Sequence, residues 1–179
     1  MKVAIEEAMV AKKHGENPFG AVLLDPNYNF CYKAHSRSIE LCDPTAHAEV
    51  LVIRDYCKEK NLVYLKDYIL LCSGEPCIMC SGAIKWAKIG QIYYSVPQSK
   101  INELSGGKLK PSCESLINSG FSQKHIVGKQ HFTIAHELYH LFIQEEFSSQ
   151  ICPQSSSDPV EKQADCFATF FLMPRNGVI

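Results

Sequence analysis

GEPCIMCSGAIKWAKIGQIYYSV, residues 74–96, carries most of the information about the fold. Pro76 suits the start of a helix, which we expect from Cys77 to Lys88, and Gly90 marks its end. One strand, QIYYSV, follows this helix, and another, YLKDYILLCS at 64–73, precedes it. Strands that alternate with helices in this way predict an α/β layered domain.

The same alternation extends over residues 1–128. The other expected elements there are a helix at 2–14, a β-hairpin made of FGAVLLD and NFCYKAH, a helix from an N-cap at Thr45 to about Lys60, a short helix in PSCESLINSG and a short strand in KHIVG. Beyond residue 128 the pattern changes to two helices, at about 130–146 and 159–173, and the charge balance turns acidic. We therefore divide the chain into an α/β domain at 1–128 and a helical segment at 129–179.

Composition narrows the class of protein. Hydrophobic residues make up 46% and charged residues 21%, as in soluble globular proteins, and the net charge of −1 gives no general attraction to nucleic acid or to an anionic membrane. The N-terminal stretch has neither the apolar run of a signal peptide nor a span of about 20 apolar residues. Nine cysteines, an odd number at irregular spacing, fit a reducing compartment. We expect a cytoplasmic protein without membrane contact.

Four residues with metal chemistry stand at the starts of two expected helices. Taken singly, the His-x-Glu is explained by the ordinary start of a surface helix, and the Cys-x-x-Cys by two thiols in the core. A proline directly before the cysteines, and the presence of both motifs in this order at helix starts, make chance a poor explanation. His47, Cys77 and Cys80 give zinc three ligands and leave its fourth position for water, which is the catalytic arrangement. Glu49 is then placed to move protons while that water attacks an amidine-like carbon and ammonia departs.

A family resemblance adds to this interpretation. NPFGAVLLD, DPTAHAEVLVIR and the opening stretch resemble the cytidine deaminase superfamily, in particular its guanine deaminase and tRNA adenosine deaminase branch, over residues 1–128. The resemblance implies a three-layer α/β/α fold with a mixed five-stranded sheet, and a homodimer through the deaminase domain. Carried over residue by residue, it makes His47, Cys77 and Cys80 the zinc ligands and Glu49 the catalytic proton shuttle.

The substrate follows less directly. The tRNA-editing members usually carry an asparagine, which orients the base, in the loop before the zinc histidine, where this chain has Ser36 and Arg37. That departure and the lack of a basic balance favour a free base or nucleoside, guanine-like purines first, over a structured RNA. Phe19 before Gly20 is more like the guanine and nucleoside deaminases, whereas we expect Trp86 and Tyr93 to be core aromatics.

A second group of metal-type residues lies in FTIAHELYHLF, residues 132–142. His136 and His140 are one helical turn apart, which suits two imidazoles on one zinc, and Glu137 can act as general base. On the next expected helix, EKQADCFATFFLMP offers Glu161 as third ligand and Asp165 as a partner that orients a ligand histidine. The alternative is an amphipathic helix with two partly buried histidines.

This second group resembles the ImmA/IrrE metallopeptidases, which cleave repressor-type proteins, over residues 129–175. The resemblance implies zinc bound by His136, His140 and Glu161, with Glu137 activating water. The strands that normally precede the first helix are replaced here by the deaminase-like region, so we expect a second bound zinc before we expect peptidase activity.

Three hypotheses for the whole chain remain open. The first is a zinc-dependent deaminase of a nucleobase or nucleoside, with a helical metallopeptidase-like segment. The second is a metallopeptidase whose first domain supplies recognition. The third is a non-catalytic chimeric chain in which the two parts keep only their local folds.

Overall fold

The computed structural model describes residues 1–119 and 126–129. The helices expected at 130–146 and 159–173 lie outside the described residues. The described elements are, in chain order, α1 (Lys2–Lys13), β1 (Gly20–Leu24), β2 (Phe30–His35), α2 (Ala48–Lys60), β3 (Ile69–Gly74), α3 (Ile78–Ala87), β4 (Gln91–Val96), α4 (Gln98–Ser105), α5 (Cys113–Ile117) and β5 (Ile126–Lys129).

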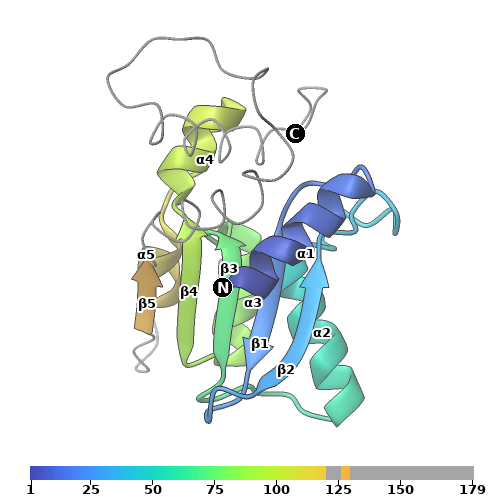
Figure 1. Ribbon diagram of the computed structural model, residues 1–179. Coiled ribbons are helices and arrows are strands. Elements are labelled where there is room, and N and C mark those ends of the chain that lie inside the picture. The colour runs from blue at the N-terminus through green and yellow to red at the C-terminus, as the bar shows by residue number, and fades with distance from the viewer. Residues whose placement is uncertain (120–125, 130–179) are drawn as a thin grey trace.

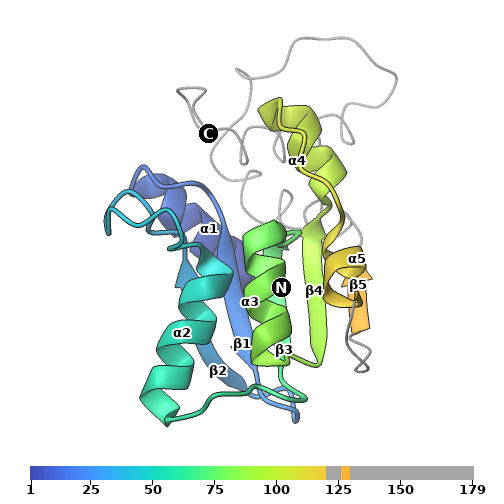
Figure 2. The same ribbon diagram turned by 180° about the vertical axis from the view of Figure 1, so that it is seen from behind.

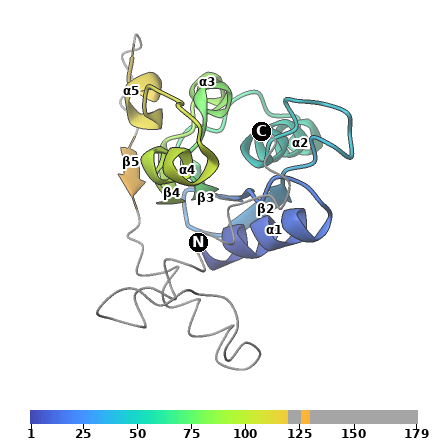
Figure 3. The ribbon, with the colours of Figure 1, turned by 90° about the horizontal axis from the view of Figure 1, so that it is seen from above.

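The strands form one mixed sheet in the order β2-β1-β3-β4-β5 (Figure 1). β1 pairs antiparallel with both β2 and β3, whereas β4 pairs parallel with both β3 and β5. Helix α1 covers one face of the sheet, and α2, α3 and α5 cover the other (Figures 2 and 3). The expected α/β fold with a mixed sheet is confirmed.

The central strands are apolar because helices cover both of their faces. Strand β1 buries three consecutive side chains, from Ala21 to Leu23, and β3 buries Ile69, Leu70 and Cys72. At Gly20 a Cβ atom would overlap the backbone of α1, so only glycine lets this helix lie so close to the sheet. The core therefore fixes β1 and β3 between the two helical layers.

The structure corrects two expectations about single residues. Thr45 does not cap α2: its N–H and its hydroxyl both donate to the Asp43 carboxylate, at 2.8 and 2.7 Å, and α2 begins at Ala48 with His47 as N-cap. Trp86 is not a core aromatic, because 73% of it is exposed on the outer side of α3. Helix α4, which follows Pro97, was not expected from the sequence.

No helix in the described part of the chain has the length and apolar character needed to cross a membrane.

A buried carboxylate joins α1 to the hairpin. Glu7, which is 7% exposed, accepts from Lys33 Nζ at 2.8 Å, and its other oxygen lies 2.9 Å from His35 Nδ1. Burial alone would raise the pKa of Glu7, but the hydrogen bonds with Lys33 and His35 outweigh it and lower this pKa below its ordinary value. A lowered pKa in the folded state means that the ionised carboxylate stabilises the fold.

We predict that Glu7→Gln lowers the free energy of unfolding by about 1–2 kcal/mol at pH 7, because the buried carboxylate loses its charge-assisted hydrogen bonds with Lys33 and His35. The contribution of the ionised carboxylate is complete above the pKa of the unfolded chain and disappears as the pH falls through the lower pKa of the folded protein. Urea unfolding of both proteins from pH 7 to about pH 3 measures this. A gap between wild type and variant that stays constant over the whole range would contradict the assignment.

Candidate metal centre

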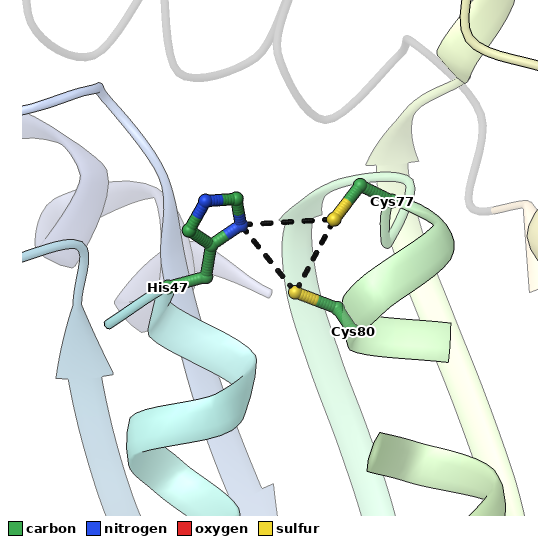
Figure 4. A group of neighbouring side chains, drawn as sticks. All are labelled: His47, Cys77 and Cys80. Carbon is green, nitrogen blue, oxygen red and sulfur yellow. Dashed lines mark hydrogen bonds between the residues drawn. The ribbon is translucent and has the colours of Figure 1, made fainter. Parts of the chain in front are cut away.

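The N-termini of α2 and α3 meet at one end of the helical layer. His47 is the N-cap of α2, and Cys77 is the N-cap of α3, both with extended backbone. Cys80 lies in the first turn of α3 and is fully buried. Figure 4 shows the three side chains pointing toward one another from the two helices.

The spacing of their donor atoms fits a tetrahedral metal ion. His47 Nδ1 lies 3.7 Å from Cys77 Sγ and 3.5 Å from Cys80 Sγ, and the two sulfurs are 3.6 Å apart. Zn–S bonds of about 2.3 Å and a Zn–N bond of about 2.0 Å at tetrahedral angles give ligand-to-ligand distances of roughly 3.5–3.8 Å. Among the described residues this is the group whose donor atoms converge in this way. The three side chains could hold zinc with one position left open.

Glu49 lies next to this group without being needed as a ligand. It follows His47 by two residues in the first turn of α2, is 5% exposed, and its Oε2 lies 3.4 Å from Cys80 Sγ. Burial raises the pKa of Glu49. A carboxyl group whose protonated form is favoured in this way can both accept and return a proton next to these three side chains.

In the absence of metal, the two neighbouring thiols share one proton. The hydrogen bond between Cys77 and Cys80, helped by His47, lowers the pKa of Cys77 to about 4 in spite of burial. The contact with Cys77, burial and the nearby Glu49 raise the pKa of Cys80. A bound divalent cation would favour both thiolates, because its charge replaces the shared proton.

The hydrogen bond with Cys77 also raises the pKa of His47. A protonated imidazole cannot bind metal, so protons compete with the metal for this site as the pH falls.

Buried carboxylates that sequence reasoning missed hold the backbone on both sides of the centre. Glu16, 5% exposed, accepts the backbone N–H groups of Ile39 and Glu40 at 3.1 and 2.7 Å, which fixes the loop before His47. Glu75 does the same beside Cys77. The one sequence signal for either is an acidic residue next to a Gly or Pro turn, which is too common to be informative.

The second group expected from the sequence, His136, Glu137, His140, Glu161 and Asp165, lies outside the described residues.

Two family models match the chain. Residues 1–96, which include His47, Glu49, Cys77 and Cys80, match the model described as the cytidine and deoxycytidylate deaminase zinc-binding region. Residues 121–179, which include the second group, match the model of the IrrE N-terminal-like domain. The two resemblances seen in the sequence are thus confirmed.

Known proteins resemble the first part of the chain. A tRNA-specific adenosine deaminase of Aquifex aeolicus is 41% identical over 100 residues, which cover 56% of this chain and 66% of that protein. A guanine deaminase of Bacillus subtilis is 40% identical over 86 residues, 48% of this chain and 54% of that protein. A solved structure from a study of A-to-I editing by tRNA:A34 deaminases superposes with a TM-score of 0.59 at 31% identity, covering 73% of this chain and 89% of that one.

We predict that Cys77 of the metal-free protein reacts with iodoacetamide at pH 6, because a pKa of about 4 leaves its thiol ionised there. Cys57, whose pKa is raised by burial, serves as the internal control and should stay unmodified at this pH. Peptide mass spectrometry after alkylation measures both sites, and added zinc should protect Cys77. A Cys77 that reacts only above about pH 8, like an ordinary thiol, would contradict the geometry.

Proposed function

Because this chain belongs to the cytidine and deoxycytidylate deaminase family, we propose that it is a zinc-dependent hydrolytic deaminase that releases ammonia from a purine base or nucleoside. The observation that carries the proposal is the convergence of His47, Cys77 and Cys80 at tetrahedral spacing, with a buried Glu49 beside them. A purely structural zinc site would not need a buried carboxylate beside its ligands.

Each of the four residues has one role in this proposal. His47 and the two cysteines hold the zinc, which when bound supplies a nucleophile at neutral pH by lowering the pKa of a water molecule. Glu49 would act as the proton carrier: it would accept a proton from the attacking water and pass protons to the ring nitrogen and to the departing amino group. Overall, the oxygen of water replaces the amino group on the amidine carbon. The carbon becomes a carbonyl carbon and the amino group leaves as ammonia, so atoms and charge balance.

A guanine-like purine is the substrate that we favour. The Ser36 N–H donates to the Phe19 carbonyl and the Arg37 N–H donates to the Ala46 carbonyl, both at 3.0 Å, which holds Ser36 beside the start of α2. A buried serine in this position has a shorter reach than the asparagine of the tRNA-editing members. The net charge of −1 also speaks against a polyanionic substrate.

Adenosine within tRNA is the second candidate, because several relatives are named tRNA-specific adenosine deaminases. Ammonia release from guanine, adenosine, cytosine and a tRNA anticodon stem-loop, measured side by side, separates these classes. Turnover of the RNA alone would overturn the preference for a free purine, while turnover of none of them would overturn the deaminase proposal.

We predict that Glu49→Gln lowers kcat/KM for the accepted substrate by about 10²–10⁴-fold, because the amide cannot take up the proton. The variant should keep its zinc, since Glu49 is not a ligand. Glu59→Gln on the same helix is the matched control: Glu59 is exposed and contacts only Lys60 among the ion pairs of the described residues, so activity should stay at the wild-type level. An active Glu49→Gln protein would refute the assigned role.

The match to the IrrE N-terminal-like domain supports a second proposed zinc site, formed by His136, His140 and Glu161, with Glu137 as its base and Asp165 orienting a ligand. Peptidase activity on a repressor-type protein is the rival function that this site would provide. If neither deamination nor cleavage occurs in zinc-loaded protein, the non-catalytic chimeric chain is the remaining hypothesis.

We predict two zinc ions per wild-type chain, falling to one in Cys77→Ser and to one in His136→Ala, because each substitution removes a ligand from a different site. Metal analysis of dialysed protein by plasma mass spectrometry gives the count. One zinc in the wild type that is lost only with Cys77 would contradict the second site.

A further inference from the structure

The loop that carries the first cysteine is held by a buried carboxylate. Glu75, two residues before Cys77, is 7% exposed and uses both of its oxygens. Its Oε2 accepts the backbone N–H of Gln98 at 2.7 Å, and its Oε1 accepts the backbone N–H of Cys113 at 2.9 Å. Its own N–H donates to the Val96 carbonyl at 2.7 Å.

These partners are the first residues of two helices. Gln98 begins α4 and Cys113 begins α5, where backbone N–H groups have no partner inside the helix. The N-cap of α4 is Pro97, whose side chain cannot accept a hydrogen bond. The Glu75 carboxylate takes that place, and its negative charge is favourable at a helix N-terminus. One side chain therefore joins the loop before Cys77 to two helices at once.

The rest of the loop is fixed by neighbouring contacts. The Ser81 hydroxyl donates to the Pro76 carbonyl at 3.2 Å, and the Ser81 N–H donates to the Cys77 carbonyl at 2.8 Å. At Gly74 a Cβ atom would lie 3.0 Å from the Phe19 ring and 3.1 Å from Ile101. The loop thus has tight packing on one side and the Glu75 hydrogen bonds on the other.

The position of Cys77 depends on this loop more than that of Cys80 does. Cys80 lies within the first turn of α3 and is fully buried, so the helix itself sets its place. Cys77 is the N-cap, with extended backbone, and lies at the junction of loop and helix. A metal site needs its ligands held within about 0.5 Å of their bonding positions. A displaced loop would move one ligand of three and leave the other two in place.

We propose that Glu75 is a positioning residue for the metal centre: by binding the starts of α4 and α5 it places the Cys77 sulfur for zinc. The inference rests on the proposed zinc site at His47, Cys77 and Cys80. Glu75 does not touch the metal or the substrate, and it acts through Cys77.

Zinc affinity of Glu75→Gln tests this. The amide keeps one acceptor oxygen but turns an NH₂ group toward the second backbone N–H, so one of the two hydrogen bonds is lost. We expect the zinc dissociation constant to rise by about 10–100-fold, as for other residues that orient metal ligands. The measurement is competition with a chromophoric chelator, made in a His136→Ala background so that the proposed second site does not contribute.

Glu7→Gln is the matched control, because Glu7 is equally buried and also bonded through both oxygens, but its partners Lys33 and His35 lie on the hairpin. Both variants should lower the melting temperature of the metal-free protein, and only Glu75→Gln should weaken zinc binding. If Glu75→Gln loses thermal stability but binds zinc as tightly as its background, the role of Glu75 is structural and the proposal is overturned.

Glu75→Asp is the second variant, in case the Glu75→Gln protein does not fold. It keeps the charge but is one methylene shorter, so weaker zinc binding in a folded protein again supports the proposal. Failure of both variants to fold with zinc present would assign Glu75 to the fold and overturn it. Because no substrate is used, the result is distinct from that of the proposed function, which fails instead if the zinc-loaded wild-type protein releases ammonia from none of the four candidate substrates.

Discussion

Everything at the candidate centre depends on the meeting of two helix N-termini on one face of the sheet. Helix α2 connects β2 to β3, and α3 connects β3 to the parallel strand β4, so both helices pack side by side on the same face. This arrangement brings residues 47 and 77, far apart in sequence, to within bonding distance of a common ion. It also places the positive ends of two helix dipoles around the two thiols, which must be ionised to bind a metal.

The sequence predicted the parts of this arrangement that depend on local chemistry. Pro-Cys-x-x-Cys and His-x-Glu each mark a helix start, and their residue types are those of a catalytic zinc site. The N-cap of α2 was misplaced at Thr45 because the Asp43 carboxylate accepts from the Thr45 N–H and hydroxyl, a local hydrogen-bond pattern that competes with capping of the helix. Trp86 was expected inside because aromatics usually pack, yet its exposure depends on which side of α3 faces the sheet.

The long-range hydrogen bonds could not have been found in this way. Glu75 contacts residues more than twenty positions away, and Glu16 holds a loop beyond the whole β-hairpin. Neither contact has a periodic or spacing signature, because a carboxylate that accepts backbone N–H groups places no demand on the side chains of its partners. Only the folded chain shows that these two acidic residues flank the metal ligands.

The two matched regions adjoin within one sheet. Strand β5, residues 126–129, pairs parallel with β4 of the deaminase-type sheet, and it also lies within the segment that matches the IrrE N-terminal-like domain. The sheet thus includes residues from both matched regions. A division of the chain between residues 128 and 129 stays a prediction. The second group of metal-type residues begins at His136, further along the sequence.

The central claim is a zinc ion bound by one nitrogen and two sulfur ligands with a fourth position left for water. Zinc-edge X-ray absorption of the zinc-loaded His136→Ala protein tests it most directly, because that variant leaves the first site as the metal site under study. The account predicts two Zn–S distances of about 2.3 Å and two Zn–N or Zn–O distances of about 2.0–2.1 Å. A spectrum without sulfur ligands, or one with four of them, would contradict it.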